Sequence, residues 1–289
     1  MDIPTASDCV LRAMTDDGAF RVMVARTTDT ARSAVEAQRV EGFAAHQLGE
    51  LITASVLVRE TMSPPNRVQV VLADDADNLI VGDAWPEGHT RGLAQVKDRA
   101  LGVDLDLGGS LRVERALPRG SSHRGVVQAP REGGLDAALT SYFTQSEQIA
   151  TFVALACVTD PGSGDLAAAG GYVVQLLPEL TEPPLAAMRS RLQEFGGLQT
   201  WLRRHGDDPQ VVLDALLATC TYTPLAHSPV AYRCHCTRTR AVGAAAALGR
   251  DDLRNLAAQG ETLRIHCDYC RTLYELGPGD FLRILDGDD

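Results

Sequence analysis

Hydrophobic and polar positions in the first 178 residues follow two periods, one typical of strands and one typical of helices. The segment 19–26, "AFRVMVAR", shows the alternation of a strand, whereas 29–40 and 42–62 carry apolar residues at helical spacing. Further strands are predicted at 67–72, 78–81, 91–96, 111–116, 124–128, 149–158 and 171–177, with another helix over 135–148. Because strands and helices are interspersed without strict βαβ alternation, this pattern predicts a mixed α+β core domain over 1–178.

A helical linker is predicted over 179–230. Three prolines mark its beginning: Pro178, Pro183 and Pro184. The apolar residues of its first helix are spaced i, i+3, i+7 and i+10, which places them on one face. They are Leu185, Met188, Leu192 and Phe195.

Two shorter helices complete this linker. Trp201 belongs to the second helix, and Asp208 followed by Pro209 is the N-cap and first-turn proline of a third helix that carries Leu216. The apolar faces have two interpretations. Either they pack permanently on the N-terminal domain, or they form a binding surface that becomes exposed in response to a trigger.

The C-terminal segment 231–289 combines helices with a pair of strands. Two helices are predicted in "TRTRAVGAAAALG" and "RDDLRNLAAQG", a strand pair around 262–275, and a final helical turn in "GDFLRILD". The segment is short and has few large apolar side chains. Domains of this size often need a covalent or metal staple, because their hydrophobic core is too small to hold the fold alone.

Composition excludes several classes of protein. The formal net charge of −11 argues against binding to nucleic acid or to an anionic membrane. Lys97 is the only lysine and follows Val96, so the Gly-Lys pair of a nucleotide-binding P-loop is absent. No targeting segment is visible, and the longest apolar stretch, 149–158, is too short to span a bilayer. These features predict a cytoplasmic protein in a reducing compartment.

The cysteines carry the clearest chemical signal. Four of the seven form two close pairs, Cys234 and Cys236 in "YRCHC" and Cys267 and Cys270 in "IHCDYC". In a reducing compartment such clusters indicate metal or redox chemistry rather than a disulfide framework. Four sulfurs fill the tetrahedron of a closed structural zinc site, so one zinc ion is predicted. Of the isolated cysteines, Cys9, Cys157 and Cys220, only Cys157 receives a role, as a small residue of the core.

Such a site is either a static staple or an oxidation switch. Cysteines one or two residues apart can also form disulfides with each other once oxidised, and the positive charges of Arg233 and Arg238 are expected to favour thiolates. Structural zinc contributes about 10–16 kcal/mol of binding free energy. A whole domain is stable by only about 5–15 kcal/mol. Loss of the metal should therefore unfold the C-terminal domain and weaken support for the helices before it.

The spacing Cys-x-Cys, a spacer and Cys-x-x-Cys resembles that of the heat-shock protein 33 family, the redox-regulated holdase chaperones of the bacterial cytoplasm. Three further segments resemble core motifs of that family, in the same order: "RGVVQ" (124–128), "YFTQSEQI" (142–149) and "AAGGYVVQLLPE" (168–179). The resemblance covers most of the chain and is weakest before residue 90.

The resemblance implies a function. In the reduced form the four cysteines would hold zinc and the chaperone would be inactive. On oxidation Cys234 would pair with Cys236 and Cys267 with Cys270, and zinc would leave. The linker would then expose apolar surface that captures unfolding client proteins without ATP, and the active form would often be a dimer. The candidate client-binding residues are those of the apolar faces: Leu185, Met188, Leu192, Phe195, Trp201 and Leu216.

The sequence favours the chaperone over two other classes of protein. A thiol–disulfide oxidoreductase would use Cys267 and Cys270, but its motif should open a helix, whereas "RTLYEL" after Cys270 predicts a strand. A nucleic-acid-binding zinc ribbon would need a basic face. The segment 231–289 instead contains eight arginines and nine acidic residues, which makes phosphate binding weak.

Overall fold

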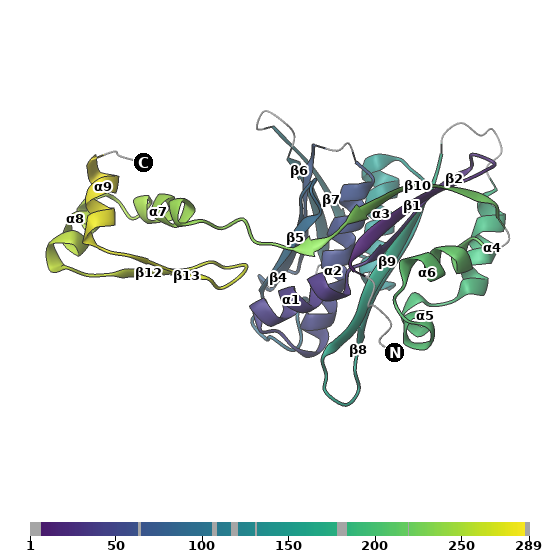
Figure 1. Cartoon of the computed structure of the whole chain (residues 1–289), viewed down its shortest axis with the longest axis horizontal. Coiled ribbons are helices and arrows are strands. Elements are labelled where there is room, and N and C mark those ends of the chain that lie inside the picture. Colours follow the sequence, from purple (N-terminus) through teal and green to yellow (C-terminus); the bar gives the residue numbers. More distant parts are fainter. Residues whose placement is uncertain are drawn as a thin grey trace. The chain divides into compact units, whose positions relative to one another are not determined.

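The structure, a computed structural model, is shown in Figure 1. It describes residues 7–62, 65–105, 109–116, 121–130, 132–177, 184–218 and 220–286. Two compact units make up the chain, Met1–Arg233 and Cys234–Asp289. The predicted boundary at 178/179, with Pro178 and Pro183, lies outside the described residues. None of the helices in the described ranges combines the length and the apolar character that a membrane span requires.

The first unit contains a five-stranded antiparallel sheet in the order β10-β1-β2-β9-β8. Its strands are β1 (Cys9–Thr15), β2 (Phe20–Arg26), β8 (Thr151–Thr159), β9 (Leu166–Leu176) and β10 (Tyr222–Pro229). Both faces of this sheet are buried. On β2, Met23 and Ala25 join one hydrophobic cluster while Phe20, Val22 and Val24 join another. Strand side chains alternate between faces, which explains why β2 is apolar at nearly every position.

A second sheet has six strands in the order β11-β5-β4-β3-β6-β7. They are β3 (Arg67–Ala73), β4 (Leu79–Ala84), β5 (His89–Gln95), β6 (Ser110–Ala116), β7 (Ser122–Gln128) and β11 (Ala231–Tyr232). Only the β11–β5 pair is parallel.

Helix α2 (Gly42–Glu60) lies between these two sheets and contacts strands of both, as Figure 1 shows. It is buried from Ala44 almost to its C-terminus, so its apolar residues surround it instead of forming one stripe. Its backbone approaches β4 closely at Gly82, where an added Cβ would lie 2.5 Å from the carbonyl oxygen of Leu51. Helices α1 (Thr28–Gln38) and α3 (Gly134–Tyr142) also pack into this core. A π-helical turn, η1 (Phe143–Glu147), continues α3.

Three helices cover the other face of the five-stranded sheet. They are α4 (Leu185–Phe195), α5 (Leu198–His205) and α6 (Pro209–Leu216), drawn in green in Figure 1. The predicted start of the third helix is confirmed, because the Asp208 side chain accepts a hydrogen bond of 2.8 Å from the Gln210 N–H and Pro209 opens the first turn. After α6 the chain enters β10, an edge strand whose side chains are mostly exposed.

The second unit contains α7 (Arg238–Ala246), α8 (Arg250–Gln259), β12 (Leu263–His266), β13 (Leu273–Leu276) and α9 (Pro278–Asp286). Its core is small: the described residues bury only Ala245, Leu253, Leu276 and Phe281 as one apolar cluster. Asp280 supports it through polar contacts. Its carboxylate accepts from the Gly277 N–H at 2.9 Å, which closes the start of α9, and from Arg238 at 2.7 Å.

The α+β class is confirmed. Most predicted helices and strands are present with shifted ends, but the helix predicted over 135–148 is α-helical only to Tyr142. The sequence prediction omitted β1, β10 and β11. Strand β10, "YTPLAHSP", contains two prolines and no apolar alternation, and such a strand is tolerated at a sheet edge.

Candidate metal centre

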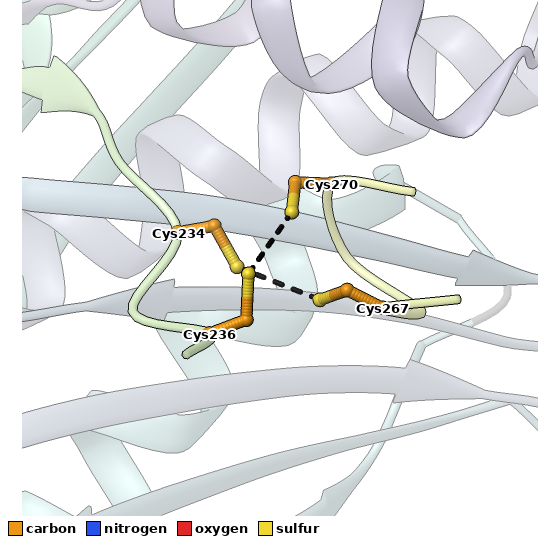
Figure 2. Close-up of side chains that lie close together, drawn as sticks. All are labelled: Cys234, Cys236, Cys267 and Cys270. Atoms are coloured by element: carbon orange, nitrogen blue, oxygen red, sulfur yellow. Dashed lines mark hydrogen bonds between the residues drawn. The ribbon is translucent and has the colours of Figure 1, made fainter. Parts of the chain in front are cut away.

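The four paired cysteines come together in the second unit. Cys234 and Cys236 lie on the extended segment before α7, whose first turn is capped by the Thr237 hydroxyl at 3.2 Å from the Arg240 N–H. Cys267 and Cys270 lie in the turn between β12 and β13. Figure 2 shows the four side chains pointing toward one another. The two pairs, far apart in sequence, thus form one cluster.

The turn between β12 and β13 fixes the second pair. The Cys267 N–H donates to the Thr272 carbonyl at 2.9 Å, and the Arg271 N–H donates to the Cys267 carbonyl at 2.8 Å. Arg271 adopts a left-handed conformation with φ of 59°, which reverses the chain. These contacts present both sulfurs on the same side of the hairpin end.

The sulfur geometry fits a tetrathiolate metal site. Cys234 Sγ lies 3.7 Å from Cys267 Sγ, and Cys236 Sγ lies 3.3 Å from Cys270 Sγ. All four sulfurs are within 4.8 Å of one another, and all four residues are half-buried free thiols. A zinc–sulfur bond of about 2.3 Å would place neighbouring sulfurs of a tetrahedron about 3.8 Å apart. The cluster therefore offers a metal ion four soft ligands at dimensions that suit zinc.

Two side-chain hydroxyls form hydrogen bonds with sulfurs of this cluster and affect the pKa values of those thiols. The Tyr274 hydroxyl donates to Cys236 Sγ at 3.1 Å, and the Thr272 hydroxyl lies 3.1 Å from Cys270 Sγ. Burial acts to raise the pKa of Cys270, but the Thr272 hydroxyl and N–H and the neighbouring sulfurs outweigh it, so that this pKa falls to about 7. Burial raises the pKa of Cys236 and of Cys267. Nothing in the local sequence pattern indicated Thr272 or Tyr274.

The predicted effect of Arg238 on the thiolates stays a prediction. Its guanidinium forms an ion pair of 2.7 Å with Asp280 and donates to the Glu275 carbonyl at 2.9 Å. Arg238 thus supports the start of α9. The hydroxyl of Thr272 lowers the pKa of Cys270 by a direct contact with its sulfur.

The candidate client-binding residues all lie on α4–α6, in the first unit. Met188 and Leu216 are buried, at 3% and 0% exposure. Leu185, Leu192, Phe195 and Trp201 are partly buried against the same hydrophobic cluster. Phe195 stacks on Trp201 with ring centres 5.4 Å apart and meets Tyr172 of β9 edge-on. In this state the apolar faces pack on the five-stranded sheet.

Comparison with known proteins decides the family, since the model described as "Hsp33 protein" matches residues 8–277. The chain belongs to the heat-shock protein 33 family. A "33 kDa chaperonin" from Syntrophotalea carbinolica is 26% identical over 96% of this chain and 99% of its own length. Another from Symbiobacterium thermophilum is 28% identical over 97% of this chain and 98% of its own.

Membership of the heat-shock protein 33 family also agrees with the fold. A crystal structure of a 33 kDa chaperonin from Thermotoga maritima superposes with a TM-score of 0.82, covering 98% of this chain and 100% of that one at 19% identity. The protein is therefore a chaperone rather than an enzyme. The thiol–disulfide oxidoreductase considered from Cys267 and Cys270 receives no support from these comparisons.

Proposed function

We propose that this protein is an ATP-independent holdase whose activity is switched on by oxidation. In the reduced form one zinc ion would be bound by Cys234, Cys236, Cys267 and Cys270. On oxidation the two close pairs would form disulfides, zinc would leave, and the protein would bind unfolding clients in the cytoplasm and prevent their aggregation. The observation that carries the proposal is the meeting of four free thiols in the unit whose apolar cluster, among the described residues, is the smallest.

Zinc would supply bonds that the second unit cannot replace. The unit has five buried apolar residues among those described, four of them in one cluster, whereas the hydrophobic clusters of the first unit run through both large sheets. Zinc contributes about 10–16 kcal/mol in structural sites of this kind. Fully burying one large apolar side chain contributes only about 1.5–3 kcal/mol. The small core is further opposed by the conformational entropy of ordering the chain. Removal of the metal should therefore unfold this unit.

The route from the metal to the client surface follows the chain itself. Cys234 is two residues beyond Tyr232, the end of β11, which in turn follows the exposed edge strand β10. Strands at a sheet edge with exposed side chains bury little apolar surface, so they are easily detached once their continuation unfolds. Loss of β11 and β10 would leave α4–α6 without their C-terminal attachment. The apolar residues Leu185, Met188, Leu192, Phe195, Trp201 and Leu216 would then become available to clients.

The disulfide pairing is a separate part of the proposal. The sulfur contacts of 3.7 and 3.3 Å in the reduced cluster join one pair to the other, Cys234 to Cys267 and Cys236 to Cys270. We propose pairing within each close pair, Cys234–Cys236 and Cys267–Cys270, because those partners stay close after the unit unfolds. Proteolysis and mass spectrometry of the oxidised chain distinguish this pairing from bridges between the two pairs. We further propose that the active form dimerises, which light scattering of reduced and oxidised protein checks.

One experiment tests the function as a whole. Zinc release, thiol number and suppression of aggregation of a thermally unfolding client are followed together during treatment with peroxide. We expect all three to change in parallel in the wild type. Cys267→Ser should lose zinc affinity, whereas Cys220→Ser, which alters a cysteine outside the cluster, should behave like the wild type. Oxidised, zinc-depleted protein that fails to slow client aggregation would contradict the holdase.

A further inference from the structure

Arg26, at the end of β2, carries a buried guanidinium surrounded by three carboxylates. Its side chain is 4% exposed, and its nitrogens lie 2.5 Å from Asp8, 2.9 Å from Asp29 and 2.8 Å from Asp207. Asp8 is buried just before β1, and Asp29 lies, partly exposed, in the first turn of α1. Asp207 comes from the loop between α5 and α6, within the segment that carries the candidate client surface. This ion cluster therefore joins that segment to the core.

A second core residue holds the same carboxylate. The Thr28 hydroxyl accepts a hydrogen bond of 2.9 Å from the Ala169 N–H of β9 and donates one of 2.6 Å to Asp207 Oδ2. The side chain of Asp207 is only 25% exposed, so water has limited access to replace these partners. Among the described residues, Arg26–Asp207 is the only ion pair that joins α4–α6 to the rest of the first unit.

The other core contacts of these helices are mostly apolar. Their residues in the hydrophobic cluster are Met188, Leu198, Leu202, Val212, Leu213 and Leu216, and Pro209 is buried as well. Apolar packing is non-directional, whereas the ion pair with Arg26 and the hydrogen bond from Thr28 both require the Asp207 carboxylate to lie at one position. Asp208, next to Asp207, caps α6. The contact of Asp207 thus fixes the beginning of α6 over the end of β2.

We propose that Arg26, Thr28 and Asp207 form a polar latch that keeps α4–α6 docked on the core while zinc is bound. Asp207 is a positioning residue: it sets how often the apolar faces leave the sheet. The inference rests on the proposed function, in which those faces bind clients. Without Asp207, Arg26 keeps Asp8 and Asp29 as partners. The charge of Arg26 therefore stays compensated when the latch opens, and the effect is confined to the helical segment.

Hydrogen exchange of the reduced, zinc-loaded full-length chain tests the latch. In Asp207→Asn we expect amides over 198–216 to exchange about tenfold faster than in the wild type, with unchanged exchange in β9. Asp208→Asn is the matched control, since it removes the same charge one residue away while asparagine remains an equally good N-cap. Equal exchange over 198–216 in the two variants would overturn the latch, because charge alone would then explain any change.

Aggregation suppression by the reduced variants separates the latch from the proposed function. If both hold, reduced Asp207→Asn should slow client aggregation without oxidant, whereas reduced wild type and Asp208→Asn should not. If hydrogen exchange shows that the segment opens in Asp207→Asn but client aggregation is not slowed, the latch is still supported. That result would count against α4–α6 as the client surface.

Discussion

Replacing Phe281 with alanine measures how tightly folding and metal binding are coupled in the second unit. Phe281 is 0% exposed and is the largest of the four buried residues in that core. Removing a buried phenylalanine side chain typically costs about 3–5 kcal/mol. If the metal-free unit is unfolded, the energy needed to fold it is taken entirely from zinc binding. The substitution should therefore weaken apparent zinc affinity by about 100-fold or more, since 1.4 kcal/mol corresponds to tenfold.

The assay is competition for zinc between the reduced protein and a chromophoric chelator of known affinity. Leu282→Ala is the matched control, because Leu282 is the neighbouring residue on the same helix and is 53% exposed. We expect this control to stay within a few-fold of the wild type. A Phe281→Ala protein that retains wild-type zinc affinity would refute the reasoning, since the four thiols would then bind the metal independently of the small core. In that case zinc loss would not unfold the unit.

Three further substitutions test other parts of the structure. Gly243→Ala places a methyl group in open space within α7 and should stabilise the second unit by about 0.5–1 kcal/mol. This gain should appear as a few-fold increase in zinc affinity, and a decrease in zinc affinity would contradict the prediction. Gly82→Ala should destabilise the first unit by at least about 2 kcal/mol in urea unfolding, because the new Cβ would lie 2.5 Å from the Leu51 carbonyl oxygen. A variant as stable as the wild type would show that α2 and β4 can move apart easily. Burial and the nearby Asp136 raise the pKa of Glu50 to about 8. Between about pH 4.5 and pH 8 the folded state therefore keeps a proton on Glu50 that the unfolded state has released. The free energy of unfolding should fall as the pH rises through this window. Glu50→Gln should flatten this pH dependence of urea unfolding, and an unchanged slope would assign it to other groups.

Local pattern predicted those elements whose periodicity reflects their own burial. Helix α2 was predicted over 42–62 and extends over Gly42–Glu60, because nearly every turn of it is apolar. Strand β1 was missed because Arg12 interrupts its apolar run, and the reason lies elsewhere in the chain: Arg12 pairs with Glu60 at 3.3 Å and donates to Ser228 of β10. Strand β10 is held through its pairing with β1 and has no hydrophobic signal of its own.

The candidate site likewise contains residues that the sequence predicted and residues that it did not. The four clustered cysteines could be named from sequence because the members of each pair are one or two residues apart, and soft sulfurs are uncommon enough for their clustering to be informative. The partners of those sulfurs could not be named. Tyr274 and Thr272 reach Cys236 and Cys270 only because β12 and β13 pair in one register. Asp207 likewise meets Arg26 only in the folded state, so no spacing in the sequence marks the contact.

The position of the cysteines in the chain would allow the proposed oxidation to act selectively. Breaking a few ligand bonds has little effect on a unit whose stability is distributed over two large sheets and a buried helix. The same loss exceeds what a four-residue apolar cluster provides. Helices α4–α6 have intermediate support, because they pack on the first unit through one face and precede the second unit in sequence. A segment with that intermediate support can change state while the other strands of the two sheets remain folded, provided that a contact such as Arg26–Asp207 prevents it from opening earlier.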